Sequence, residues 1–311
     1  MLAGDNSILS NATKAKEMTE DSQRNEQARL DEYAALIDSV TGEETGLTEQ
    51  ADGTFKDSKG NEWVWIEVPN DGTGPTYPAD ATDTQIETAL RTYCSDVIAT
   101  TGNNTKTTTC GFTDTWYDGC GLSESEYNTT KSKMLNSIKD NGGFYIGKYE
   151  TGIDDSSIAE DATTTAGLRT SPGDTVQIAV IKQNKEPYTY VTCSQAETLA
   201  KGFATDGKTS SLLFGIQWDL VLKFIKVKEN LLDNSILTGD STDWGNYYNS
   251  TYNITNTEAW YSTDYGANWT KGAYNKISGG AGGTLLTTGA HTDFSKQNIY
   301  DLAGNVIEKK F

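Results

Sequence analysis

The strongest constraint on the fold is a run of thirty residues without glycine or proline, from Asn11 to Val40. The run is rich in Ala, Glu, Lys, Gln and Arg, which favour helix, so it predicts one long helix. Between Thr19 and Asn25 it carries no apolar residue, and that part is therefore expected to be solvated rather than packed. The helix is expected to stop at Gly42, where an acidic and polar stretch typical of a linker begins.

The composition limits the classes of partner. The chain has 311 residues, enough for one large domain or two ordinary ones, with 44 Asp and Glu against 25 Lys and Arg and a net charge of −19. This acidity argues against nucleic-acid binding through a general basic face. No segment approaches the roughly 18 to 20 apolar residues of a membrane span, and the N-terminus has no signal-peptide pattern, so the chain as written is expected to be soluble.

Histidine and cysteine restrict the chemistry. His291 is the one histidine, which excludes a zinc site made of several imidazoles, and with no evident nucleophile beside it we expect it at the surface. The cysteines form no C-x-x-C pair, which argues against metal ligation and thioredoxin-like chemistry. Two alternatives stay open: disulfides in an exported protein, with Cys110 or Cys120 bridged, or four unpaired thiols. The cysteines are Cys94, Cys110, Cys120 and Cys193.

Helices and strands follow in a mixed order after the linker. The segment Asn61 to Pro69 alternates large β-forming residues and predicts a first strand, which proline ends. A helix that begins with a capping box at Ser123 and Glu126 is expected to end at Gly142. Further strands are expected at 142–152 and 176–181, and the expected helices are 83–99, 123–140, 194–203 and 212–228.

Aromatic residues concentrate between Trp244 and Trp269, where eight of 26 residues are Trp or Tyr. Their neighbours are small and polar, as in binding loops, and supply few aliphatic side chains to bury the rings. Some rings, with Tyr248, Tyr252 and Tyr265 foremost, are therefore expected to be exposed and to contact a ligand. The alternative is an insertion whose rings pack on one another and on the sheet. The expected ligand-binding residues are Trp244, Tyr247, Tyr248, Tyr252, Trp260, Tyr261, Tyr265 and Trp269.

Four segments occur in the order expected of the formylglycine-generating-enzyme-like family, whose domain is a variant of the C-type lectin fold. They are GGFYIGKYETG, EPYTYVTCSQAETLA, LLFGIQWDLVLKF and NIYDLAGNVIEKKF, of which the last is the most specific. The chain therefore resembles a sulfatase-modifying-factor domain, which implies an α+β fold with long irregular loops. The expected organisation is a stem helix at 1–42, a linker at 43–60 and this domain at 61–311, without the closing strands of the family.

The same resemblance bears on metals. The family has a calcium site made of two side-chain ligands and two backbone carbonyls. The corresponding positions in this sequence are Asp301, Gly304, Val306 and Glu308. Such a set of oxygen ligands suits a hard cation. Two lysines follow beside that position, and the alternative is a turn shaped by Gly304 and capped by Asp301. The family enzymes hold copper with a cysteine pair just after this turn. This sequence lacks that pair, so neither copper nor catalytic residues are expected.

The N-terminal sequence LAGDNSILSNATKAKE resembles the stretch that follows the hydrophobic half of the helix in type IV pilin-like proteins of Gram-positive bacteria. This implies display outside the cell, with membrane attachment through a hydrophobic segment that precedes the sequence. A capped surface helix is the alternative.

Together these features predict a non-enzymatic, extracellular or cell-surface adhesion module that binds a glycan or a surface protein. It is similar to the variable proteins of diversity-generating retroelements. The alternatives are an oxidase of the formylglycine-generating type and a structural subunit of a pilus or phage tail.

Overall fold

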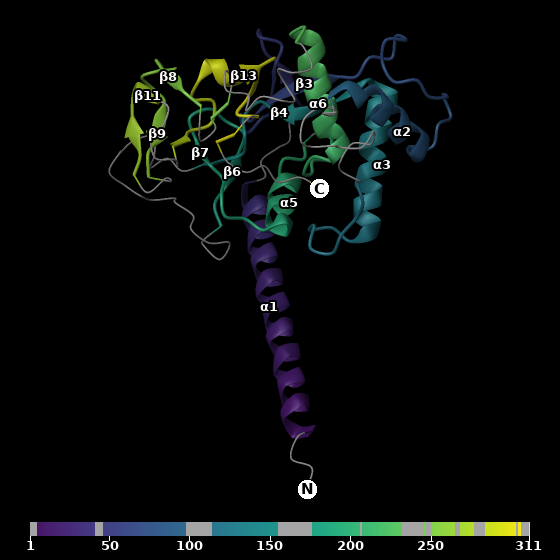
Figure 1. Ribbon diagram of the computed structural model, residues 1–311, viewed down its shortest axis with the longest axis vertical. Coiled ribbons are helices and arrows are strands. Elements are labelled where there is room, and N and C mark those ends of the chain that lie inside the picture. The colour runs from purple at the N-terminus through teal and green to yellow at the C-terminus, as the bar shows by residue number, and fades with distance from the viewer. Residues whose placement is uncertain are drawn as a thin grey trace.

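The computed structural model describes residues 5–40, 46–97, 114–154, 176–205, 207–231, 245–246, 250–264, 268–276, 284–302, 304–305 and 311. Figure 1 shows a long helix, α1 (Asp5–Val40), that projects from a head formed by the other elements. The head combines helices with several small antiparallel sheets, so the fold is mixed α+β, as expected. Within the described ranges, no helix is both long and apolar enough to cross a membrane.

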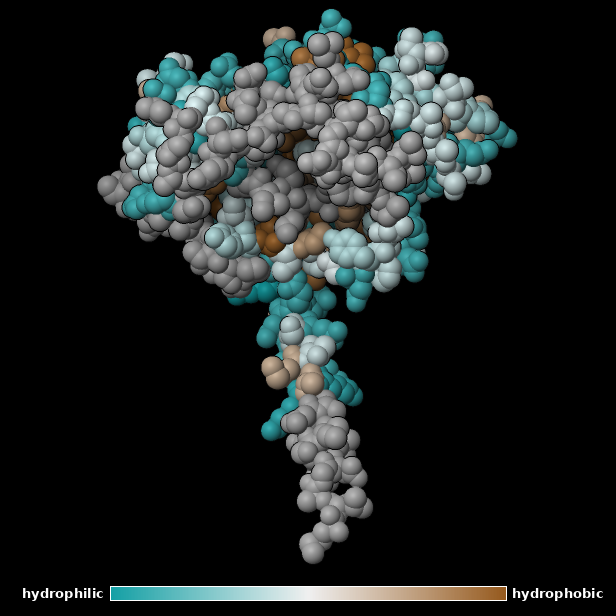
Figure 2. All heavy atoms as spheres, in the orientation of Figure 1, coloured by the Kyte–Doolittle hydropathy of each residue, from teal (hydrophilic) through white to brown (hydrophobic). Residues whose placement is uncertain are grey.

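Helix α1 is solvated along its middle and docked at its C-terminal part. Every residue from Thr19 to Asn25 is exposed, as predicted, and Figure 2 shows mainly hydrophilic atoms on the stem next to the head. Farther along, Tyr33 is fully buried. It belongs to a cluster with Ile153, Val176, Tyr188 and Leu199. Glu26 accepts a hydrogen bond of 2.9 Å from the hydroxyl of Thr192, the N-cap of helix α5 (Cys193–Lys201), so the stem is held to the head through α5.

The central sheet has four antiparallel strands in the order β1-β2-β3-β4. They are β1 (Thr48–Glu49), β2 (Phe55–Lys56), β3 (Glu62–Glu67) and β4 (Gly143–Gly147). Strands β1 and β2 lie in the segment predicted to be a linker. The turn between β2 and β3 is closed by Asp57, whose carboxylate accepts the N–H groups of Lys59 and Asn61, and this polar turn lets a polar segment join the sheet.

Helices α2 (Asp83–Tyr93), α3 (Glu124–Asn141) and α6 (Gly215–Lys228) enclose the main core with this sheet. The capping box predicted at Ser123 and Glu126 is present, and Gly142 ends α3 with a left-handed φ of 75°. A short 3-10 turn, η1 (Ser95–Val97), follows α2. The buried side chains of this core include Ile66, Ile86, Leu90, Leu135, Ile138, Phe214, Ile216 and Val221.

Small sheets of two or three strands make up the other side of the head (Figure 1). Their strand orders are β6-β5-β7, β10-β9-β12, β11-β8 and β13-β14. The strands are β5 (Gly152–Ile153), β6 (Ala179–Val180), β7 (Glu186–Pro187), β8 (Tyr252–Ile254), β9 (Trp260–Ser262), β10 (Thr270–Lys271), β11 (Tyr274–Lys276), β12 (Leu285–Leu286), β13 (Ser295–Lys296) and β14 (Ile299–Tyr300), with the short helix η2 (Thr292–Phe294) before β13. The strand expected at 142–152 is thus divided into β4 and β5, and the one expected at 176–181 has two residues.

Candidate functional site

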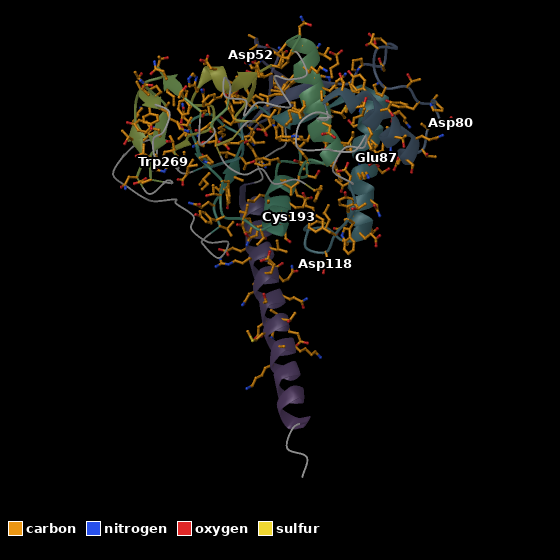
Figure 3. All side chains as sticks on the ribbon, viewed as in Figure 1. Asp52, Asp80, Glu87, Asp118, Cys193 and Trp269 are labelled. Carbon is orange, nitrogen blue, oxygen red and sulfur yellow. The ribbon has the colours of Figure 1, made fainter. Side chains whose placement is uncertain are left out.

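The aromatic region is packed inward at the rings that the structure describes. Tyr252, Trp260 and Trp269 have exposed fractions of 8%, 5% and 6%, so the prediction that Tyr252 is exposed is wrong (Trp269 is labelled in Figure 3). Tyr261 is half buried and stacks on Tyr274, with 4.2 Å between ring centroids. The apolar neighbours of Tyr252 come partly from the region itself, with Ile254 and Ala259, and partly from a later segment that includes Leu286, Ala290 and Phe294. The other four predicted ligand-binding residues, Trp244, Tyr247, Tyr248 and Tyr265, lie outside the described residues.

The proposed calcium ligands are only partly described. Asp301 is 3% exposed, and its Oδ2 accepts the N–H of Gly289 at 2.6 Å. Burial raises the pKa of this carboxyl well above its usual value. Val306 and Glu308 lie outside the described residues. Among the residues described, no group of three or more His, Cys, Asp or Glu is placed to hold a metal. The side-chain hydrogen bond of Asp301 goes to Gly289 rather than to its own turn, and the calcium site stays a prediction.

Asn305, next to Gly304 in the same motif, joins three segments of the head. Its Oδ1 accepts hydrogen bonds from Leu286 N–H and Asn246 Nδ2, each at 2.9 Å. Its Nδ2 donates to the Leu286 carbonyl at 3.1 Å and to Glu150 Oε1. The specific motif of the sequence is therefore a structural junction here, with Gly304 in left-handed conformation at φ 80°. The sequence analysis selected the neighbouring residues Gly304 and Val306 as site residues and did not predict a role for the side-chain amide of Asn305.

His291 is buried, with an exposed fraction of 8%, which corrects the expectation of a surface histidine. Its Nδ1 accepts the N–H of Asp293 at 3.1 Å and so caps η2. Its ring lies 4.7 Å from that of Phe294 between centroids, and burial lowers the pKa of the imidazole. The residue thus has a local structural role, as a polar cap in an otherwise apolar cluster.

Cys120 is fully buried, and its thiol donates to the Leu122 carbonyl at 3.5 Å, so a bridge through Cys120 is absent from this structure. Cys193 is half buried where the stem meets the head (Figure 3), and its Sγ accepts a hydrogen bond from the hydroxyl of Tyr117 at 2.9 Å. Cys110 lies outside the described residues.

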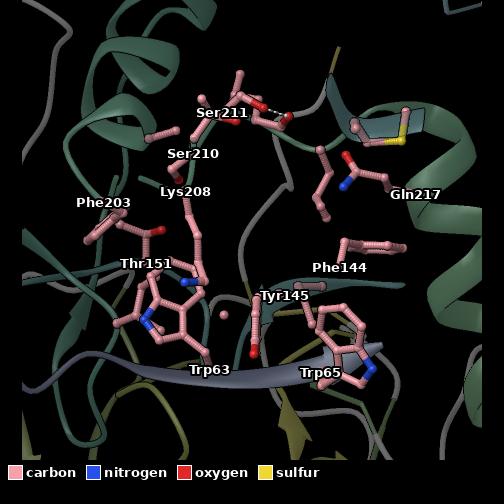
Figure 4. A pocket seen from close by; sticks show the side chains of 18 of the residues that line it. Trp63, Trp65, Phe144, Tyr145, Thr151, Phe203, Lys208, Ser210, Ser211 and Gln217 are labelled. Carbon is pink, nitrogen blue, oxygen red and sulfur yellow. Dashed lines mark hydrogen bonds between the residues drawn. The ribbon is translucent and has the colours of Figure 1, made fainter. Parts of the chain in front are cut away.

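A cavity of about 710 Å³ opens beside β4 and is the best candidate for a ligand site (Figure 4). Its walls come from β3, β4, the C-terminal half of α3, the segment 203–213, the start of α6 and residues 299–302. These parts are distant in sequence, and the central sheet brings them together.

The aromatic wall of the cavity follows from the W-V-W alternation of β3. Trp63 and Trp65 lie on the face of the sheet that is turned away from the main core, and both are half buried. Tyr145 of β4 stands opposite Trp65, with 4.7 Å between ring centroids, and Phe203 packs edge-on against Trp63 at 5.9 Å. A side chain in place of Gly143 would come within 2.6 Å of the Trp65 ring, so glycine there makes room for the indole. The sequence predicted this strand, and the pairing of its two tryptophans on one face was the signal for the site.

Hydroxyl and amide groups complete the lining. Figure 4 shows Thr151, Ser210, Ser211 and Gln217 around the space between the rings. Lys208 is exposed at the rim, on a tight turn in which it pairs with Thr205. Flat rings combined with hydrogen-bonding groups suit a ligand that has both apolar and polar surfaces.

Comparison with protein-family models, with curated proteins and with solved structures finds no match to this chain. The fold and the cavity therefore define the protein as a mixed α+β head on a helical stem, and the family resemblance stands on the four sequence segments alone.

Proposed function

We propose that this protein is a non-enzymatic binding module of the cell surface or the extracellular space, in which a helical stem carries a head of the C-type-lectin-like type. The observation that carries the proposal is the 710 Å³ cavity with Trp63, Trp65 and Tyr145 on its wall. The ligand is a glycan or a surface protein, and it binds in the cavity rather than on the aromatic region. Large rings that are half buried keep area available for a partner while the rest of each ring is fixed by packing.

The stem supports a display function. Helix α1 has 36 residues, which corresponds to about 54 Å at 1.5 Å per residue. Its described contacts with the head begin near Glu26, so most of its length separates the head from whatever holds the N-terminal end. Attachment through a pilin-like segment and the C-type-lectin-like type of the head are the parts of the proposal that rest on sequence resemblance. The same helix also favours a second candidate function, a structural subunit of a pilus or phage tail, which would bind no separate ligand.

A binding screen with matched tryptophan variants tests the proposal. The wild-type chain, Trp63→Ala and Trp116→Ala are applied to a glycan array and to a panel of purified surface proteins. Trp116 is the control because it is 37% exposed and does not line the cavity. We expect Trp63→Ala to weaken binding about 30-fold, which corresponds to roughly 2 kcal/mol, while Trp116→Ala binds like the wild type.

Circular dichroism of Trp63→Ala shows whether the head is still folded. A ligand that binds equally well to the folded Trp63→Ala and to Trp65→Ala would move the site away from the cavity. A head that binds nothing in either panel would favour the structural subunit.

A further inference from the structure

Strand β4 forms an edge of the central sheet, because the described strands follow the order β1-β2-β3-β4. Two hydrogen bonds at the ends of β4 show which of its residues are bonded to β3. Lys148 N–H donates to the Glu62 carbonyl at 2.9 Å, and Val68 N–H donates to the Gly142 carbonyl at 2.8 Å. Bonded pairs alternate in an antiparallel ladder, so the even-numbered residues of β4 bond to β3 and the odd-numbered ones direct their N–H and C=O groups to the free edge.

Tyr145 is the central residue of this free edge. On one side of it, the Gly143 carbonyl accepts the hydroxyl of Ser137 at 3.0 Å. Just beyond the C-terminal end of β4, the ladder with β3 ends, because the Lys148 carbonyl accepts the N–H of Tyr300 at 2.8 Å and Glu62 N–H donates to Ile181. The backbone N–H and C=O of Tyr145 have no partner in the ranges that the structure describes. An unpaired edge of this kind is a template for another strand.

The cavity surrounds this edge, because side chains from both faces of β4 line it. Phe144 and Ile146 line it from the face that belongs to the main core, and Tyr145 lines it from the aromatic face. Across the cavity from Tyr145 lies the segment 209–213, of which Figure 4 labels Ser210 and Ser211. The space is therefore bounded by the edge of β4 on one side and by the segment 209–213 on the other.

The geometry points to an extended peptide segment of a partner protein as the occupant, added to β4 as a fifth strand through backbone hydrogen bonds at Tyr145. This inference rests on the proposed function and names a protein, rather than a glycan, as its ligand. The N–H and C=O groups at the edge of β4 need an acceptor and a donor beside them. The backbone of a polypeptide in extended conformation supplies both.

The side chains around the edge specify the peptide further. Successive side chains of an added strand point alternately to the two faces of the sheet. One set meets Phe144 and Ile146 in the main core, which selects aliphatic or aromatic residues. The other set meets Trp63 and Trp65 together with the hydroxyl groups of the cavity, which accept polar residues such as Thr or Ser. With a net charge of −19 on the chain, basic residues at the ends of the peptide are favoured.

A pair of substitutions at Tyr145 separates backbone pairing from ring contact. Tyr145→Val removes the ring but keeps the N–H and a good strand former, whereas Tyr145→Pro removes the N–H as well. Proline is tolerated on an edge strand whose N–H lies outside the ladder, so the head is expected to fold. The probe is a phage-displayed library of nine-residue peptides selected on the wild-type chain, and the enriched peptides are then measured by fluorescence anisotropy. We expect selection of alternating apolar peptides whose binding is at least tenfold weaker for Tyr145→Pro than for Tyr145→Val.

Hydrogen exchange of the wild-type chain supplies a readout that needs no variant. The amide of Tyr145 should exchange more slowly when a selected peptide is bound. Selected peptides without alternation, equal affinity for the two variants, or unchanged exchange at Tyr145 would overturn the inference. If a glycan binds in a Trp63-dependent way and no peptide is selected, strand addition fails and the proposed function stands. If neither kind of ligand binds, both fail.

Discussion

Replacement of Glu197 by glutamine is expected to stabilise the protein at alkaline pH and to have much less effect in mild acid. Glu197 lies on α5 and is fully buried. Its Oε2 accepts the N–H of Leu212 at 2.8 Å, and its buried Oε1 has no hydrogen-bond partner within the described chain. Burial raises the pKa of the carboxyl from 4.5 to about 7. Glutamine keeps an oxygen for Leu212 and does not titrate.

The sign of the effect follows from proton linkage. Because the pKa of Glu197 is raised in the folded state, the folded protein binds this proton more tightly than the unfolded chain does. The associated stability is fully present below pH 4.5 and is lost as the pH rises through 7. With 1.36 kcal/mol per pKa unit, the loss is about 3 kcal/mol at pH 8 and about 1 kcal/mol at pH 5. The advantage of Glu197→Gln over the wild type should therefore be about 2 kcal/mol greater at pH 8.

Urea unfolding at pH 5 and pH 8 measures this difference. The matched control is Glu124→Gln, which changes an exposed glutamate of α3 and should alter the pH dependence little. Comparing each variant with the wild type at the same pH removes the contribution of other titrating groups. If Glu197→Gln changes the free energy of unfolding by the same amount at both pH values, the carboxyl does not titrate as argued and the reasoning fails.

Three further substitutions test the packing described above. Tyr252→Ala should lower the free energy of unfolding by about 3 to 5 kcal/mol, because the ring is buried, and an unchanged melting temperature would instead show that it is exposed. Asn305→Ala should cost about 2 to 4 kcal/mol in the same assay, since it removes the side-chain partner of the Leu286 N–H and carbonyl and one of the two bonds that Asn246 Nδ2 donates, and a loss below the error of the measurement would contradict the junction. Asp301→Asn should reduce the loss of stability that accompanies rising pH, because the pKa of this carboxyl is raised in the folded protein. Saturating Ca²⁺ should shift the melting temperature of neither the wild type nor this variant. A calcium-dependent rise of the melting temperature in the wild type alone would identify a calcium site.

Elements whose ends or exposure depend on neighbouring residues could be predicted from the sequence. The capping box at Ser123 and the glycine after α3 act within one helical turn, and both were predicted correctly. The solvated middle of α1 followed in the same way from the absence of apolar residues. Strands β1 and β2 were missed because two-residue strands carry almost no periodicity, and a side-chain turn at Asp57 rather than an apolar pattern aligns β2 with β3.

Burial in the aromatic region could not be inferred from its own composition. Tyr252 is covered by Leu286, Ala290 and Phe294, which are 34 to 42 positions away and become neighbours only when the chain folds. The cavity has the same origin, because its lining runs from β3 to residues near Leu302. The sequence predicted the strand that bears Trp63 and Trp65 but contained no signal for the opposite wall.

The docking of the stem has a mechanical consequence. Because α1 contacts the head at Tyr33 and at the N-cap of α5, part of any tension applied to the N-terminal end of α1 is delivered to α5. Helix α5 also carries Glu197, whose hydrogen bond holds Leu212 in the wall of the cavity. Traction on the stem therefore reaches one wall of the cavity through α5 and the buried Glu197.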